Sequence, residues 1–139
     1  MALKASQLKV GDTHTERVCE NLSRTQLVMY AGASGDYNPL HSDEVYSVYA
    51  GYKSVFAHGM LSMGLTGKML TNWVGDARLK KFGVRFTNQV WPGDTLDAKA
   101  TVTAIRQENG EHLVDLTLTT VNQDGKEVVS GSAIARVDP

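Results

Sequence analysis

The sequence predicts an α+β fold in which an antiparallel β-sheet wraps around one long apolar helix. Three observations support this prediction: a helical segment over residues 60–74 with hardly any polar face, alternating strand patterns after it, and Asn-Gly and Asp-Gly turns between the last strands. A helix that is apolar nearly all round should be buried, and strands with one apolar face need a covering layer. The 139 residues are therefore expected to form one domain over residues 1–139.

The first elements of the chain are short. Residues 13–19 have a strand pattern, and Ser23 then resembles an N-cap that completes a capping box with Gln26. The helix that follows is predicted to run to about Ala33 and to stop at Gly35, because glycine readily adopts the left-handed conformation that ends helices.

A turn and a second short helix precede the central helix. Residues 36–41 are predicted to turn because Pro39 disfavours helical geometry at the residue before it. Ser42 is expected to cap the short helix and Gly51 to end it. The functional candidates described below therefore lie in a short, partly helical segment before the long apolar helix.

Strands are predicted for the rest of the chain. Phe82, Val84 and Phe86 alternate with less apolar residues, and Pro92 begins a Pro-Gly-Asp turn. The next strand, residues 95–106, is expected to bury one face, which carries Leu96, Ala98, Ala100, Val102 and Ala104. Asn109-Gly110 and Asp124-Gly125 are hairpin signals on either side of a strand around residues 112–121, and a final strand covers about 126–137.

The composition excludes several classes of protein. Hydrophobic residues make up 42% of the chain, charged residues 21%, and the net charge of −1 gives no basic surface for nucleic acid. No apolar run approaches the ~20 residues that span a bilayer. The single Cys19 cannot form an internal disulfide, and the first residues do not resemble a signal peptide. We therefore expect a cytoplasmic protein that binds neither membrane nor nucleic acid.

The stretch from Tyr30 to His41 places a carboxylate, an amide and an imidazole close together. Asp36 and His41 are each common structural residues when they occur alone, but the turn through Asn38 and Pro39 can bring their side chains toward one point. A water held between a carboxylate and an imidazole can lose a proton to one group while the other protonates carbon. The pair therefore predicts acid–base chemistry on an activated carbonyl compound.

Gly59 lies where the apolar helix is predicted to begin. A helix N-terminus leaves backbone N–H groups unpaired, and its dipole attracts negative charge. Gly59 is therefore a candidate donor to the oxygen of an enolate, although a glycine here also suits a helix packed tightly against a strand. His58 is interpreted as structural.

Other kinds of site are not indicated by the sequence. Asp36, His41 and His58 do not follow zinc-ligand spacings, and no phosphate loop or dinucleotide-binding fingerprint is present. The Gly-x-Ser-x segment that ends at Asp36 lacks the last glycine of a nucleophile elbow. We expect no metal and no cofactor.

The S-G-D-x-N-P-L-H sequence within residues 30–41 resembles the signature of the MaoC-like family, and A-H-G-M at 57–60 and the stretch from Val84 to Thr95 also match the family's pattern. The family contains (R)-specific enoyl-CoA hydratases and (3R)-hydroxyacyl thioester dehydratases. The resemblance covers most of the chain. It implies a hot-dog fold, in which a long sheet wraps a central helix, and subunits that usually pair into dimers.

The resemblance also implies roles for four residues. Asp36 and His41 match the catalytic pair, Asn38 a positioning residue, and Gly59 the oxyanion donor. Some hydratases carry a serine farther along the central helix, where this chain has glycines at Gly64 and Gly67. Ser62 is nearby but is expected to face elsewhere.

The implied reaction is the reversible hydration of a trans-2-enoyl thioester to the (R)-3-hydroxyacyl thioester, the work of a hydro-lyase. The carrier is coenzyme A or an acyl-carrier protein, and Arg85, Lys80 and Lys81 are candidate contacts for its phosphates, with ordinary surface charge as the alternative. The chain is expected to act as a homodimer, or as the catalytic subunit of a heterodimeric dehydratase in fatty-acid elongation.

Two further readings stay open. The chain could be a non-enzymatic subunit that only binds acyl thioesters, although the presence of all four site residues argues against this. It could also be a hot-dog thioesterase, but the carboxylate expected on the central helix is missing because residues 60–74 contain neither Asp nor Glu.

Overall fold

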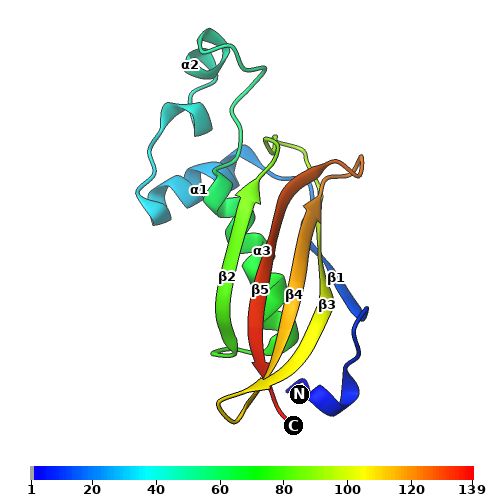
Figure 1. The fold of residues 1–139 in the computed structure, drawn as a ribbon. Helices are drawn as coiled ribbons and strands as arrows, with labels where there is room; N and C mark the ends of the chain where they lie inside the picture. The colour runs from blue at the N-terminus through cyan, green and yellow to red at the C-terminus, as the bar shows by residue number, and fades with distance from the viewer. Residues whose placement is uncertain (1) are drawn as a thin grey trace.

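The computed structural model describes residues 2–139. Within them, five strands form one antiparallel sheet in the order β1-β3-β4-β5-β2, and helix α3 lies against one face of that sheet (Figure 1). The strands are β1 Thr13–Cys19, β2 Leu79–Phe86, β3 Leu96–Glu108, β4 Glu111–Val121 and β5 Glu127–Val137. The helices are η1 Ala5–Gln7, α1 Arg24–Ser34, η2 Pro39–His41, α2 Glu44–Tyr49 and α3 Gly59–Val74. The predicted sheet around one central helix is confirmed.

The inner face of the sheet forms the main core. The alternation predicted for β3 is correct up to Val102, which is buried like Leu96 before it. A register shift between Val102 and Ala104 then interrupts the pairing with β4. Such a bulge exchanges the two faces of a strand, so Ile105 packs against the core and Ala104 is only half-buried.

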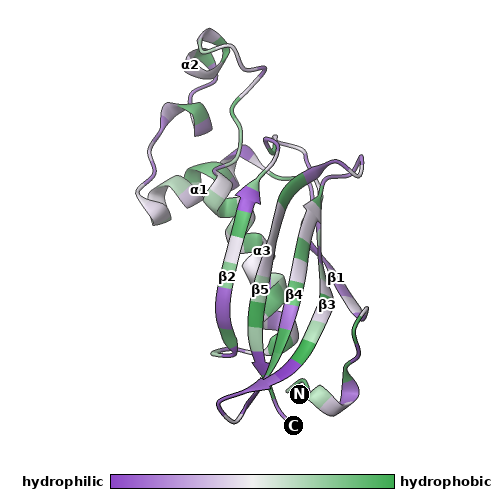
Figure 2. Ribbon diagram, in the orientation of Figure 1, coloured by the Kyte–Doolittle hydropathy of each residue, from purple (hydrophilic) through white to green (hydrophobic). Residues whose placement is uncertain are grey.

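Helix α3 is buried along one side and exposed along the other, which differs from the predicted burial all round. Its buried residues are Leu61, Ser62, Thr66, Met69, Leu70 and Val74. The opposite side includes Met60, which is 55% exposed. The buried hydroxyl of Thr66 is satisfied at 2.7 Å by Thr120 of β4. The buried side of α3 is thus partly polar. Most of the residues at which α3 and the sheet meet are nevertheless apolar, and Figure 2 shows apolar residues along α3 and the strands that it covers.

Helices α1 and α2, with η2 between them, extend beyond one end of the sheet (Figure 1). The N-cap of α1 is as predicted, because the Ser23 hydroxyl accepts a hydrogen bond from the N–H of Gln26 at 3.0 Å. Gly35 ends the helix in the left-handed conformation with φ of 77°. Helix α2 begins later than predicted, since Asp43 rather than Ser42 caps it. These caps define both ends of the segment that carries Asp36 and His41.

No helix in residues 2–139 combines the length and the apolar character that crossing a membrane requires.

Candidate active site

The turn between α1 and η2 brings Asp36 and His41 together. Asp36 Oδ1 accepts a hydrogen bond from the N–H of Asn38 at 3.3 Å, and the Asn38 side chain accepts one from the N–H of Leu40 at 3.0 Å. These local bonds fold the backbone back on itself. As a result the Asp36 carboxylate lies 3.9 Å from His41 Nε2. The predicted meeting of the carboxylate and the imidazole is confirmed, and Asn38 stabilises the turn between them.

The two groups of this pair have different environments. The Asp36 side chain is 53% exposed, whereas that of His41 is 10% exposed. His41 Nδ1 lies 2.6 Å from the backbone oxygen of Phe56, and because a carbonyl oxygen can only accept, Nδ1 carries the hydrogen. In the neutral ring Nε2 is therefore unprotonated and faces Asp36. This is the form of histidine that can take a proton from a water.

His58 lies behind the pair. Its ring stacks on that of His41 with centroids 3.8 Å apart and an interplanar angle of 25°, and its Nε2 is 3.1 Å from the backbone oxygen of Asp36. Burial lowers the pKa of His58, and the neighbouring His41 lowers it further, while the bond to Asp36 acts in the opposite direction. The sequence indicated no more than a structural histidine, because the partners of His58 are 17 and 22 residues away along the chain.

Gly59 is the first residue of α3, as predicted, and its φ does not lie in the left-handed region. No acceptor within residues 2–139 receives its N–H, as expected for the first turn of a helix. A Cβ added at Gly59 would lie 2.7 Å from Cδ2 of the Phe86 ring. The glycine is therefore required for close packing against the end of β2, and it leaves a backbone donor free at the same place. The structure therefore agrees with both predicted roles of Gly59, which are tight packing against a strand and a backbone donor to an oxyanion.

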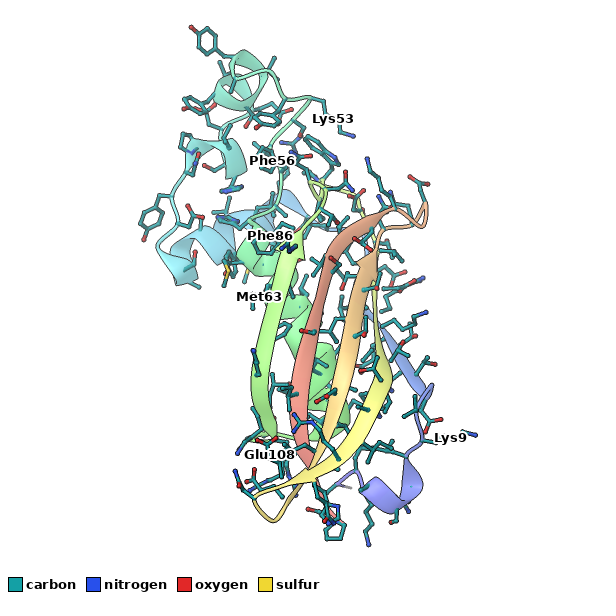
Figure 3. All side chains as sticks on the ribbon, viewed as in Figure 1. Lys9, Lys53, Phe56, Met63, Phe86 and Glu108 are labelled. Atoms are coloured by element: carbon teal, nitrogen blue, oxygen red, sulfur yellow. The ribbon has the colours of Figure 1, made fainter. Side chains whose placement is uncertain are left out.

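A cavity of about 260 Å³ opens beside Gly59. Its lining includes Phe56, Gly59, Ser62, Phe86, Val90 and Val128, and Figure 3 shows Phe56 and Phe86 at the end of the molecule where α1 and α2 lie. The expectation that Ser62 faces elsewhere is wrong. Ser62 follows Gly59 by three residues and so lies on the same side of the helix, a relation that was readable in the sequence.

Donor atoms of Asp36, His41 and His58 all lie within 4.8 Å of one another. The expectation of no metal relied on spacing along the chain, but His58 lies 17 residues after His41, and only the fold brings it to the turn that carries Asp36 and His41. The two imidazoles are stacked face to face, whereas shared ligation needs their nitrogen lone pairs to converge on one ion. The absence of a metal stays a prediction.

The three candidate phosphate contacts lie on β2. Lys80 pairs with Glu111 at 3.0 Å near one end of the strand, and Arg85 lies near the other end, next to Phe86. Six residues of strand separate Lys80 from Phe86, which corresponds to roughly 20 Å at about 3.3 Å per residue. The fold of one chain therefore does not bring Lys80 and Lys81 together with Gly59, and Arg85 is exposed on the strand close to it.

Glu44 links the segment around the site to the rest of the molecule. Its carboxylate accepts hydrogen bonds from Arg24 of α1, from the Ser54 hydroxyl and from the N–H of Val55. Val55 directly precedes Phe56, whose carbonyl oxygen holds His41. Glu44 thus connects α1 and α2 to the irregular segment that leads into α3.

The bond from Arg24 holds the pKa of Glu44 below its ordinary value. A carboxylate with a lowered pKa in the folded state stabilises that state above its unfolded pKa, and this stability is lost as the pH falls through the folded pKa. Glu44→Gln is therefore expected to lower the melting temperature at pH 7 and to flatten its decline below about pH 4. Thermal melts from pH 7 to pH 3 measure this, and Glu20→Gln, at an exposed position, is the control. An unchanged slope for Glu44→Gln contradicts the assignment.

The sheet wrapped around α3, with the acid–imidazole pair beside the N-terminus of that helix, makes this chain a hot-dog protein. The family described as "MaoC like domain" matches residues 6–123. The chain belongs to this family.

Individual relatives agree with the assignment. The (R)-specific enoyl-CoA hydratase of Rhodospirillum rubrum is 32% identical over 135 residues, which cover 92% of this chain and 88% of that protein. The structure of the R-hydratase PhaJ1 from Pseudomonas aeruginosa superposes with a TM-score of 0.87 at 29% identity and covers 99% of this chain and 88% of that one. A peroxisomal hydratase-dehydrogenase-epimerase of Neurospora crassa is 37% identical over 72% of this chain.

Several relatives are much longer than this chain. It spans 10% of the Neurospora protein and 38% of the "Probable enoyl-CoA hydratase 2" of Dictyostelium discoideum.

Proposed function

We propose that the chain is a hydro-lyase that adds water reversibly to trans-2-enoyl thioesters and forms (R)-3-hydroxyacyl thioesters. The observation that carries this proposal is the 3.9 Å separation between Asp36 and His41 Nε2, the nitrogen that the contact with Phe56 leaves without hydrogen in the neutral ring, next to the free N–H of Gly59. One water hydrogen-bonded to both side chains fits such a separation. The name of the Rhodospirillum relative supports the same substrate class and stereochemistry, and the name of the Pseudomonas structure supports an R-hydratase.

In the proposed hydration, His41 Nε2 accepts a proton from the bridging water while the water oxygen bonds to C3 of the enoyl group. The Asp36 carboxylate takes this proton from the His41 imidazolium and delivers it to C2 on the same face. One water is consumed, and no proton is gained or lost overall. Dehydration follows the same steps in reverse. Asn38 contributes by holding the turn between the two side chains.

The negative charge of the enolate has to be stabilised while C2 awaits its proton. In the proposal the thioester oxygen accepts a hydrogen bond from the Gly59 N–H, and the dipole of the 16-residue helix α3 acts in the same direction. The cavity beside Gly59 would then receive the acyl chain. Its lining combines apolar residues such as Phe56, Val90 and Val128 with the polar residues Ser62, Thr87, Asn88 and Gln89.

The proposal includes a homodimer that uses coenzyme A thioesters. It also includes a cytoplasmic location, which agrees with a single cysteine, Cys19, that is free and buried. Exposed apolar side chains gather on α1 and α2, the helices that extend beyond the end of the sheet. They include Val28, Met29, Val45, Tyr46, Val48 and Tyr49. Strand β2 is an edge of the sheet and pairs only with β5 among the described strands. An exposed apolar patch and an open strand edge both favour association.

Light scattering on the purified chain tests the dimer. Twice the chain mass is expected, whereas a monomer that becomes active only with a second protein supports the heterodimeric dehydratase. Assays with matched acyl groups on coenzyme A and on acyl-carrier protein identify the carrier. Arg85→Ala is expected to raise KM for the preferred carrier, and Lys80→Ala is the matched control on the same strand.

The reaction itself is tested by following the absorbance of the conjugated thioester with crotonyl-CoA and a longer enoyl-CoA. Loss of absorbance with an (R)-3-hydroxyacyl product is the expected result. Equal rates before and after treatment with a chelator are expected, since no step uses a metal. Release of free thiol without hydration would instead identify a thioesterase, and loss of activity on chelation that added Zn²⁺ restores would identify a metal site at Asp36, His41 and His58.

A further inference from the structure

His58 is almost completely buried, with 1% of its surface exposed, and its two ring nitrogens have different environments. Nε2 faces the backbone oxygen of Asp36 at 3.1 Å, so Nε2 carries a hydrogen. Nδ1 is buried and has no hydrogen-bond partner within residues 2–139. A hydrogen on both nitrogens would leave a charged and unsatisfied donor away from water. His58 is therefore held as the neutral ring with its hydrogen on Nε2.

The groups that face His58 come from three elements. The ring of His41, on η2, covers one face of the His58 ring, the ring of Tyr30, on α1, meets it edge-on with centroids 4.8 Å apart, and Asp36 lies in the turn between these elements. His58 itself directly precedes Gly59. It therefore contacts both members of the acid–base pair while its own backbone continues into the proposed oxyanion donor.

We propose that His58 is a positioning residue for the hydration. Its Nε2–H holds the backbone of Asp36, and its neutral ring supports the ring of His41, so that acid and base keep the separation that one water bridges. The inference rests on the proposed function and assigns a role that the sequence did not indicate.

Asp36 needs such an anchor because its other bonds are local. Its N–H donates to the Ser34 hydroxyl and its carboxylate accepts from the N–H of Asn38, so these bonds move with the exposed turn. The bond from His58 spans 22 residues and ties the turn to the N-terminus of α3. A displacement of about 1 Å in a reacting group can cost on the order of 100-fold in rate. The hydrogen bond from His58 therefore fixes the position of Asp36, the proposed proton donor, relative to Gly59, the proposed oxyanion donor.

Three substitutions separate the hydrogen bond from the ring. His58→Gln keeps a donor near the position of Nε2 but loses the ring, His58→Phe keeps the ring but loses the donor, and His58→Leu loses both. We expect kcat to fall roughly 10- to 100-fold in the Phe and Leu variants and about fivefold or less in the Gln variant, with KM nearly unchanged. Rates are compared at equal folded fraction, measured by circular dichroism.

The pH profile gives the second readout. Removing the ring exposes the covered face of His41 to water, and water favours the charged imidazole over the neutral base. The acid limb of kcat/KM is therefore expected to move to higher pH in the Gln and Leu variants and to stay in place in the Phe variant. A residue that serves only folding would lower the melting temperature without moving this limb. The proposal is overturned if the three folded variants have equal kcat and the acid limb of their kcat/KM profiles lies at the same pH as in the unmodified protein.

Nitrogen-15 NMR of the unmodified protein provides a test that needs no variant and no activity. His58 is expected to remain the neutral ring with hydrogen on Nε2 at pH 6.5, where a free imidazole is about half charged, because its pKa is lowered by burial. Titration of His58 near its ordinary pKa of about 6.5, or hydrogen on its Nδ1, refutes the inference. If the unmodified protein hydrates no enoyl thioester, the proposed function fails instead, whatever the NMR result.

Discussion

Asp36→Asn and His41→Ala are each expected to lower the turnover of enoyl-thioester hydration by at least ~100-fold, because each removes one partner of the acid–base pair. Asparagine keeps the oxygen that accepts the hydrogen bond from Asn38, so the turn can persist while the carboxylate charge is lost. Initial rates of hydration with crotonyl-CoA measure the effect. The proposed mechanism requires both losses.

His41 also bonds to the Phe56 carbonyl, so a loss of activity in His41→Ala could arise from a disturbed fold. His41→Asn separates the two causes, because the asparagine amide can still donate near the position of Nδ1 but offers no base at Nε2. The Asn and Ala variants are expected to be similarly inactive. Asp124→Asn, the same chemical change in an exposed hairpin turn, is the control and should retain full activity. A folded Asp36 or His41 variant with a nearly normal rate removes that residue from the mechanism.

The second large effect is expected for the backbone N–H of Gly59. Proline lacks this N–H and is well tolerated at the first position of a helix. His58, which precedes it, already has φ of −57° and ψ of 136°, values that suit a residue before proline. The ring of Phe86 obstructs any side chain at position 59, so the substitution is combined with Phe86→Ala to provide the space.

The informative comparison is between Gly59→Pro/Phe86→Ala and Gly59→Ala/Phe86→Ala. The two double variants both add a Cβ and both lack the Phe86 ring, but only the proline variant lacks the donor. We expect kcat to be ~100- to 1,000-fold lower in the proline variant, the usual effect of removing one oxyanion donor. Phe86→Ala alone gives the baseline. Rates within tenfold of each other, in proteins with similar melting curves, would assign Gly59 to packing against Phe86 alone.

These experiments treat the site as two halves that meet at His58. One half is the turn that carries Asp36 and His41, and the other is the N-terminus of α3 that begins at Gly59. The His58 substitutions examine the connection between the halves, whereas the Asp36, His41 and Gly59 substitutions examine the halves themselves. A loss in the His58 series that matches that of His41→Ala, with the same pH profile, would indicate that the connection is as important as the base.

Much of the fold was predictable because its signals are local. The order of strands and helices, the cap at Ser23 and the end of α1 at Gly35 all follow from neighbouring residues, and the structure confirms them. The switch of the inner face of β3 from Ala104 to Ile105 was not predictable, because the bulge depends on the register with β4. Helix α2 starts one residue later than predicted, because Ser42 is the C-cap of η2 and Asp43 is the N-cap of α2.

The sequence by itself determined the candidates for the chemistry, because Asp36, Asn38 and His41 lie within six positions on one turn and Gly59 begins the apolar helix. The tertiary structure alone decided which nitrogen of His41 is free, where His58 lies and that Lys80 lies far from Gly59. Each of these features depends on a contact between segments that are distant in the chain. Hydrophobic periodicity and turn signals describe a residue's neighbours along the chain, whereas packing and strand register select its neighbours in space.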